Sequence, residues 1–357
     1  MTKPAIKLAA PDLQHLTGDI FVAAGMPEAA AAKVAEVLVW ANLRGADSHG
    51  VQRIPRYVEL IDDGAMNPRP AMRVAFETPA ASLIEADRAA GPVAMSFATT
   101  EAVRKARGSG IGLALVRQTT HTAAQGYYTA MAARDGMAAL SGSCSSPNMI
   151  YYGARAAGVS TSPLSIAVPG AARDPLVLDM ATGVVAMGKI VHARRTGQRL
   201  EPGWAVDAEG KPTTDPARAA LPLPLGGPKG SGLSLMIECI ASLITANPLL
   251  ADTFEGKPEG EKHRQNAFLI AIDIARFCDL DLFQDNVRRL VAGLKSLPRQ
   301  PDVDEVLMPG ERGSRMLARR SRDGIPIPAA TWSELGRVAR RFGLSMPTNA
   351  DGSWTAQ

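Results

Sequence analysis

The stretch DSHGVQR at 47–53 gathers a carboxylate, a hydroxyl, an imidazole and a guanidinium within seven residues. Because Asp47 and Ser48 are good helix N-caps, a short helix is expected to begin at one of them. On such a helix His49 and Arg53 stand at i and i+4 and share a face. That face would offer a proton carrier with a pKa near neutrality beside a guanidinium fork that grips a carboxylate.

A histidine and an arginine on one helix face are also typical of a solvated or structural pair, so the spacing alone leaves both interpretations open. Pro55 lacks an N–H and restricts the residue before it, so the first helix should end there and restart over 56–62. Two helical patterns, at 12–24 and 27–43, lead into this stretch. The first part of the chain is therefore expected to be mostly helical.

The rest of the chain alternates between strand and helix patterns, which predicts an α/β fold. Strands are expected within 74–85, 108–117, 137–143, 159–168, 176–180 and 266–273. Helices are expected over 91–108, 123–134, 184–192, 233–246, 280–294, 314–322 and 332–342. The apolar run 233–250 contains Glu238, Asn247 and Pro248, so it predicts a buried helix and not a membrane span.

Composition bounds the partners of this protein. The chain has 357 residues and a formal net charge of +4, and its Lys and Arg residues form no aromatic-interleaved patch, which argues against nucleic-acid binding. A small positive surplus suits an anionic substrate or cofactor. The three cysteines lie far apart without metal-ligand spacing, so we expect no metal site and a reducing, cytoplasmic setting. No apolar signal-peptide core is visible at the N-terminus.

Two glycine-rich turns could approach phosphates. GSGIGL at 108–113 fails the GxGxxG pattern because Leu113 replaces the third glycine and a strand follows instead of a helix, so no Rossmann fingerprint is present. LGGPKGSGL at 225–233 opens a predicted helix, where free N–H groups, the helix dipole and Lys229 would attract an anion. The alternative is a tight turn that lets a buried helix pack closely.

Six stretches together closely resemble the malate/L-lactate dehydrogenase family that is distinct from the Rossmann-type enzymes and includes ureidoglycolate and sulfolactate dehydrogenases and piperideine-2-carboxylate reductase. They are LRGADSHGVQRIPRY at 43–57, HTAAQGYY at 121–128, DPLVLDMATGVVAMGKI at 174–190, GWAVDAEGKPTTDP at 203–216, GGPKGSGLSLM at 226–236 and MPGE at 308–311. The resemblance implies a non-Rossmann α/β fold, with a helical N-terminal part and a mixed-sheet cofactor-binding domain, and a homodimer. It divides the chain into a helical part at 1–75, a cofactor-binding domain at 121–245, and a substrate and dimerisation part at 76–120 and 246–357.

The resemblance also implies roles for individual residues. His49, helped by Ser48, or else His121, would be the acid/base; Arg53 would hold the substrate carboxylate, and Thr161 would contact the substrate. The expected cofactor contacts are His121, Thr122, Ala123, Ala124, Gln125, Asp179, Met180, Ala181, Lys229, Gly230, Pro309, Gly310, Glu311 and Arg312.

The chain departs from the family pattern at three places that bear on the substrate. STSP at 160–163 replaces the usual GTNP, and CSS at 144–146 replaces the usual TNS turn. Lys189 stands where the imine reductase carries an aspartate thought to relay charge to its histidine. This last difference favours an oxo or hydroxy acid over a cyclic imine.

The predicted function is hydride transfer between NAD or NADP and a small 2-oxo or 2-hydroxy acid of the malate or lactate kind. The alternatives are NADPH-dependent reduction of a cyclic imine and a non-enzymatic family member. His192, Arg194, Arg195 and Arg199 follow a predicted cofactor contact closely, so they favour NADP through its 2′-phosphate, with NAD also used. A solvated basic loop is the alternative for this cluster.

Overall fold

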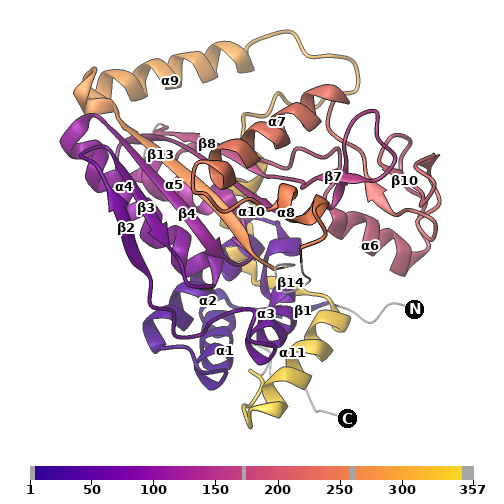
Figure 1. Ribbon diagram of the computed structural model, residues 1–357. Coiled ribbons are helices and arrows are strands. Elements are labelled where there is room, and N and C mark those ends of the chain that lie inside the picture. The colour runs from indigo at the N-terminus through magenta and orange to yellow at the C-terminus, as the bar shows by residue number, and fades with distance from the viewer. Residues whose placement is uncertain (1–4, 171–173, 258–262, 348–357) are drawn as a thin grey trace.

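A seven-stranded mixed sheet runs through the computed structural model, which describes residues 5–170, 174–257 and 263–347 (Figure 1). The strand order is β2-β3-β4-β13-β5-β8-β9. Their bounds are β2 Arg73–Glu77, β3 Ala81–Glu85, β4 Ile111–Thr119, β13 Gln265–Asp273, β5 Met137–Ser145, β8 Leu164–Val168 and β9 Leu176–Met180. Only the β3–β4 pair is parallel among these neighbours. The mixed α/β fold class is therefore confirmed.

Helices cover the sheet on both faces. On one face lie α4 (Gly91–Ser109) and α5 (Gln125–Arg134), and on the other lie α7 (Pro228–Glu238) and the π-helical turn Cys239–Leu243. Small side chains let α4 approach its strand closely: a Cβ on Gly112 of β4 would stand 1.9 Å from the carbonyl oxygen of Ala102. The larger core lies on the α4 and α5 side.

The N-terminal part is helical as expected, with α1 (Ala10–Ala23), α2 (Glu28–Leu43) and α3 (Ile54–Asp62). The C-terminal helices α10 (Glu311–Asp323) and α11 (Ala329–Arg341) return to it, because β1 (Ile6–Leu8) pairs antiparallel with β14 (Ile325–Ile327). Sequence reasoning missed this pair because segments of three residues carry too little periodicity. The two ends of the described chain thus build one unit around the predicted catalytic stretch.

The remaining helices and strands connect these parts. They are β6 (Met149–Ile150), β7 (Ala157–Val159), α6 (Met187–Thr196), β10 (Ala205–Val206), β11 (Pro212–Thr213), β12 (Leu221–Pro222), α8 (Leu250–Phe254) and α9 (Leu280–Lys295). Figure 1 shows α9 at the outer end of the molecule, beyond β13. In the part of the chain that the structure describes, no helix is long and apolar enough to cross a membrane.

The prediction of one buried helix over 233–246 is wrong, because one side of the segment is exposed to solvent. The segment consists of α7 and the π-helical turn, and only one side faces the sheet, where Ile237 and Ala241 pack with Phe268. On the other side Met236 is 55% exposed and Ile244 63% exposed. Hydrophobicity indicated burial here, but one sheet face can bury only one side of a helix.

The division of the chain into a helical part, a cofactor-binding domain and a substrate and dimerisation part stays a prediction.

Candidate active site

The predicted catalytic stretch at 47–53 is not one helix. Asp47–His49 and Val51–Arg53 form two separate 3₁₀ turns, with Gly50 in an extended conformation between them. The prediction that His49 and Arg53 share a face of an α-helix at i and i+4 is therefore wrong in its geometry. Both side chains nevertheless line the same cleft, His49 from the first turn and Arg53 from the second.

The bend at Gly50 follows from its contact with Asn42 of α2. A Cβ on Gly50 would stand 2.1 Å from Asn42 Oδ1, so no larger residue fits there. Asn42 Oδ1 instead accepts a hydrogen bond from the N–H of Val51 at 2.8 Å, and Asn42 Nδ2 donates to Asp47 Oδ1 at 2.6 Å. Arg320 of α10 grips both carboxylate oxygens of Asp47. Asp47 therefore holds the turn in place and is not available to the cleft.

The cleft has a volume of about 660 Å³ and gathers residues from most of the predicted motifs. The predicted residues on its wall are Ser48, His49, Arg53, His121, Thr122, Ala123, Ala124, Gln125, Thr161, Asp179, Met180 and Ala181. The rings of His49 and His121 stack at a centroid distance of 5.6 Å with 22° between their planes. Two segments 72 positions apart thus present a pair of imidazoles to one space.

Tyr57 fixes the tautomer of His121. Its hydroxyl lies 2.9 Å from the carbonyl oxygen of His121 and 2.8 Å from the Nδ1 of the same residue. A carbonyl oxygen only accepts, so the single hydroxyl proton goes to it and Nδ1–H donates to the Tyr57 oxygen. This assignment leaves Nε2 of His121 as the unprotonated nitrogen.

Both imidazoles are neutral at physiological pH. Burial lowers the pKa of His49 to about 4, and the positive charge of Arg53 adds to the effect. Burial, Arg53 and then His49 lower the pKa of His121 well below its usual value. A neutral imidazole with an open nitrogen is a proton acceptor, so the resting site is prepared to act as a base.

Arg53 and Thr161 lie on the wall beside the histidines. Arg53 Nε donates to the carbonyl oxygen of Ser48 at 2.6 Å, which leaves its two terminal nitrogens for other partners. The backbone N–H of Thr161 donates to Asn148 Oδ1 at 2.8 Å, so Asn148 positions that loop. Ser48 Oγ lies 2.9 Å from Nδ1 of His49. A bidentate cation thus stands next to the proton acceptors.

A buried polar network holds the segment that carries His121. Gln125 donates to Thr122 Oγ1 at 2.8 Å and accepts from Ser141 Oγ at 2.8 Å, while the N–H of Thr122 donates to Gln265 Oε1. Ala123 has a φ of 55°, a left-handed conformation that costs a non-glycine residue about 1–3 kcal/mol. This segment is therefore held in a defined shape by contacts with β5 and β13.

Asp179 of β9 lines the cleft and contacts the start of α5. Its Oδ2 accepts from the N–H of Gly126 at 2.8 Å, and a Cβ on Gly126 would stand at the same distance from that oxygen. Desolvation by the surrounding protein raises the pKa of the Asp179 carboxyl to about 6, although the Gly126 N–H and the charge of Arg44 act to lower it. The carboxylate thus sits at the positive end of the α5 dipole.

Residues 8–336 match the family described as malate/L-lactate dehydrogenase. The chain belongs to this family. It is 36% identical to a malate dehydrogenase of Pyrococcus horikoshii over 333 residues, which cover 90% of this chain and 91% of the relative. It is 33% identical to a pyrroline-2-carboxylate/piperideine-2-carboxylate reductase of Pseudomonas putida, over 91% of this chain and 95% of the relative.

The fold agrees with this membership. A solved structure of malate dehydrogenase from Pyrococcus horikoshii superposes with a TM-score of 0.87 at 32% identity, covering 96% of this chain and 97% of that one. Relatives in the malate/L-lactate dehydrogenase family thus include an enzyme named for a hydroxy acid and one named for cyclic imines. The resemblance seen in the sequence motifs is confirmed.

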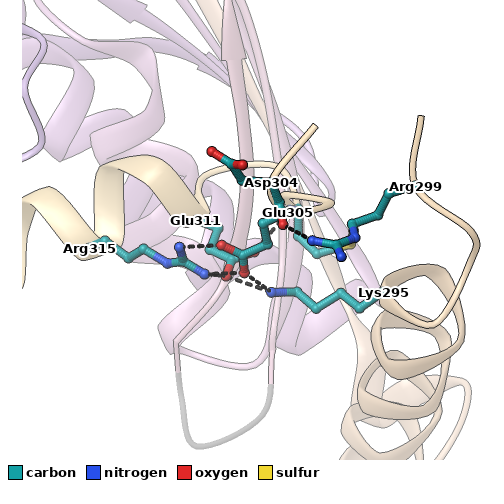
Figure 2. A network of polar contacts seen from close by, with 7 residues as sticks. Lys295, Arg299, Asp304, Glu305, Glu311 and Arg315 are labelled. Atoms are coloured by element: carbon teal, nitrogen blue, oxygen red, sulfur yellow. Dashed lines mark hydrogen bonds and ion pairs between the residues drawn. The ribbon is translucent and has the colours of Figure 1, made fainter. Parts of the chain in front are cut away.

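Some predicted cofactor residues of this family member lie away from the cleft. Among the residues that line the cleft in the described chain, none comes from the segments at 229–230 and 309–312. Figure 2 shows how Glu311 is engaged: with Glu305 it forms ion pairs to Lys295 and Arg315. The N–H of Val177 donates to the carbonyl oxygen of Pro309, which places that turn beside β9. Their role in cofactor binding stays a prediction.

Lys189 is not among the described residues that line the cleft. Its Nζ lies 5.7 Å from the ring centroid of Trp204, and the residue that faces Ser48 is Gly188, whose Cβ would stand 3.2 Å from the Ser48 Cβ. The reason is the helical turn of α6, which directs neighbouring residues to different sides. The correspondence of Lys189 with the aspartate of the imine reductase stays a prediction.

The two described arginines of the basic cluster, Arg194 and Arg199, bind other parts of the chain. Arg194 donates to the carbonyl oxygens of Pro216 and Ala219, and Arg199 donates to Thr214 Oγ1. Neither lines the cleft. The side chains of His192 and Arg195 lie outside the described part of the structure.

Sequence reasoning missed several residues of the site. Tyr57, Asn148 and Gln265 are polar residues on or beside the wall whose roles depend on partners far along the chain. Tyr57 alone carried a usable signal, because a tyrosine four residues after Arg53 falls on the same side of a helix. No cluster of three or more His, Cys, Asp or Glu that could hold a metal ion occurs among the described residues.

Proposed function

We propose that this protein transfers a hydride between a nicotinamide dinucleotide and a small 2-oxo or 2-hydroxy acid. The observation that carries the proposal is one cleft in which two stacked neutral imidazoles stand beside Arg53. Oxidation of a hydroxy acid removes a proton from oxygen while hydride leaves carbon, and reduction reverses both steps. The site therefore needs a proton carrier and a cation for the carboxylate, and both are present.

We assign the proton transfer to His121, with its Nε2 accepting the proton of the substrate hydroxyl. His121 lines both the main cleft and an adjoining lobe, whereas His49 lines only the main cleft. The hydrogen bonds between Tyr57 and His121 keep the proton of the neutral imidazole on Nδ1, so the accepting Nε2 is unprotonated in the resting protein. His49, contacted by Ser48, stacks on His121, so its charge state influences that of the carrier.

The wall formed by α5 and β9 fits a nicotinamide dinucleotide. The first residue of α5, Gln125, lines the cleft beside the Asp179 carboxylate. Asp179 offers a carboxylate acceptor for a ribose hydroxyl, and Met180 and Ala181 offer apolar surface. When bound, the nicotinamide supplies or accepts the hydride. These residues would hold and orient it.

An oxo or hydroxy acid is the preferred substrate class over a cyclic imine. Gly188 faces Ser48, so no carboxylate reaches His49 from this position. Asp47, the nearest acid in sequence, is held by Asn42 and Arg320. The alternative, reduction of a cyclic imine, is supported by the 33% identity to the Pseudomonas putida reductase. A non-enzymatic role is the remaining alternative.

A substrate panel tests the proposal. Pyruvate, oxaloacetate and piperideine-2-carboxylate are assayed with NADH and NADPH in the wild type, His121→Gln and His49→Gln. We expect turnover of an oxo acid, and a loss of about 10²–10⁴-fold in kcat for His121→Gln, with cofactor affinity unchanged by fluorescence titration. Higher kcat/KM on the imine supports the alternative. The absence of turnover with every substrate contradicts enzymatic function.

Three further proposals follow the resemblance. We propose a preference for NADP with NAD also used, a cytoplasmic location, and a homodimer. The helix α9 supports the homodimer, because none of its residues is buried in the single chain although it carries an apolar stripe. The Discussion gives the tests of cofactor preference and dimerisation.

A further inference from the structure

The helix α10 buries a charged residue. Among the described residues of α10, Arg320 alone is buried, with 8% of its surface exposed. Its two terminal nitrogens donate to the two carboxylate oxygens of Asp47 at 2.7 Å and 3.1 Å. Nη1 also donates to the carbonyl oxygen of Asn42, whereas no partner for Nε occurs among the described residues. Arg320 thus binds α2 and the turn at 47–49 from 273 positions along the chain.

The free energy of unfolding gives little reason for an arginine at this place. Burying a guanidinium loses hydration, and an ion pair recovers that loss only when the remaining donors are satisfied as well. The unpartnered Nε of Arg320 adds to the cost. An apolar side chain of similar volume would avoid both costs. The geometry that the guanidinium imposes on Asp47 explains the arginine better than its contribution to stability.

Asp47 connects the guanidinium to both 3₁₀ turns of the cleft wall. Its Oδ1 also accepts from Asn42 Nδ2 at 2.6 Å, and Asn42 Oδ1 accepts from the N–H of Val51 at 2.8 Å. Asp47 begins the first turn, which carries His49. Val51 begins the second turn, which carries Arg53. One chain of hydrogen bonds therefore holds the two turns relative to each other.

The helix α10 is itself fixed on both sides of Arg320. Near its start, Arg44 of α2 donates to the carbonyl oxygen of Gly310 at 2.9 Å and to Ser314 Oγ at 3.2 Å. After its end, β14 pairs with β1. The guanidinium therefore holds the turn at Asp47 from an element whose position other contacts determine.

We propose that Arg320 is a positioning residue for hydride transfer, because it holds the turns of His49 and Arg53 in place. The inference rests on the proposed function. Arg320 acts through Asp47 and is not among the described residues that line the cleft. Arg53 must reach the substrate carboxylate while the histidines face the reacting oxygen, so a displacement of about 1 Å between the turns can lower the rate by roughly 100-fold.

Kinetics of Arg320→Gln, Arg320→Lys and a matched control, Arg341→Gln, test this role. Arg341 of α11 also forms a two-bond ion pair with the N-terminal part, to Asp62 of α3 at 2.5 Å and 2.8 Å, and neither is among the described residues that line the cleft. We expect Arg320→Gln to lose about 10–100-fold in kcat/KM for the best oxo acid, through both kcat and KM, with the Kd of NADH and NADPH unchanged in fluorescence titration. Arg320→Lys should restore part of the loss, and Arg341→Gln should keep wild-type kinetics.

The variant Asp47→Asn shows whether Arg320 acts through Asp47. An amide cannot accept both guanidinium bonds through two oxygens, so the loss should be of similar size. The double variant Arg320→Gln/Asp47→Asn should lose no more than the larger single loss, because both changes remove the same contact. Losses that multiply overturn the inference. If Arg320→Gln does not fold, Asp47→Asn carries the test, and its wild-type kinetics would overturn the inference.

The outcomes separate this inference from the proposed function. Wild-type kinetics of Arg320→Gln overturn the inference and leave hydride transfer to oxo acids standing. An Arg320→Gln variant that loses cofactor affinity together with turnover assigns Arg320 a general structural role and overturns the inference too. No turnover of any oxo acid by the wild type overturns both.

Discussion

At the scale of single residues, the site is prepared to take up a proton. Tyr57 leaves Nε2 of His121 open, and burial with Arg53 nearby lowers the pKa of both histidines. A lowered pKa means that the imidazolium is less stable relative to the neutral imidazole. The imidazole is therefore a weaker base, but it is unprotonated over a wider pH range. In the proposed complex, an anionic substrate at Arg53 would oppose this effect, since a nearby negative charge favours the imidazolium.

The pH dependence of kcat/KM follows from these pKa values. A base must be unprotonated in the free enzyme, so oxidation of a 2-hydroxy acid should stay level from pH 9 down to values well below 6.5, the usual pKa of histidine. Reduction needs the imidazolium, whose fraction decreases as the pH rises above the pKa. The kcat/KM for reduction should therefore fall about tenfold for each unit that the pH rises over the same range. Initial rates in both directions, in buffers of constant ionic strength, measure this. An oxidation profile that is half-maximal at pH 6.5 or above contradicts it.

Arg53 provides a second test at this scale. Its Nε is already committed to the Ser48 carbonyl, so the two terminal nitrogens would bind the substrate carboxylate as a fork. Arg53→Lys supplies a point charge instead, and we expect KM to rise and kcat to fall by about 10-fold or more. Steady-state kinetics with the best acid substrate measure both. Unchanged kinetics would remove Arg53 from the substrate site.

At the scale of elements, the orientation of α6 determines which of its residues line the cleft where the cofactor is proposed to bind. Its residues Met187, Gly188 and Val191 line the cleft. Arg194, in contrast, is engaged by the carbonyl oxygens of Pro216 and Ala219, which ties α6 to the following loop. The proposed preference for NADP therefore depends on Arg195, which follows Val191 by one helical turn in the sequence.

Arg195→Ala and Arg194→Ala form a matched pair for cofactor choice. If Arg195 contacts the 2′-phosphate, its removal should lower the kcat/KM ratio for NADPH over NADH by roughly 10–100-fold, the value of a charge-assisted hydrogen bond. Arg194→Ala should lower the melting temperature and leave the ratio unchanged. A wild type that prefers NADH, or a ratio that Arg195→Ala does not change, contradicts the proposed NADP site.

At the scale of the whole molecule, α9 presents apolar surface that the single chain does not cover. Phe283, Val287, Leu290 and Leu294 recur at helical spacing, and Leu290 is 60% exposed and Leu294 39% exposed. A stripe of this kind on an outer helix is typical of a protein interface. We propose that the second copy in the homodimer covers it.

Substitution of the stripe tests the homodimer. Leu290→Glu/Leu294→Glu should convert a dimer to a monomer in light scattering after gel filtration, because burying two carboxylates in an apolar contact costs several kcal/mol. Ala292→Glu, on the opposite side of α9, adds a charge without touching the stripe and should stay dimeric. A wild type that is monomeric at micromolar concentration, or a double variant that stays dimeric, contradicts this interface.

The sequence by itself determined the kinds of residue and most of the elements. Local periodicity predicted the strands and helices. Short motifs identified the family, whose resemblance implied the mixed sheet, and singled out His49, Arg53 and His121. These features depend on neighbours within a few positions, so they can be recognised without knowing the fold.

Only the tertiary structure decided which of these residues meet. Asn42 and Arg320 shape the turn at Asp47, Tyr57 sets the tautomer of His121, and Arg56 contacts His263. Lys229 and the turn at 309–312 lie outside the described cleft wall. Contacts between residues far apart in the chain depend on how the elements pack, and periodicity carries no information about that packing.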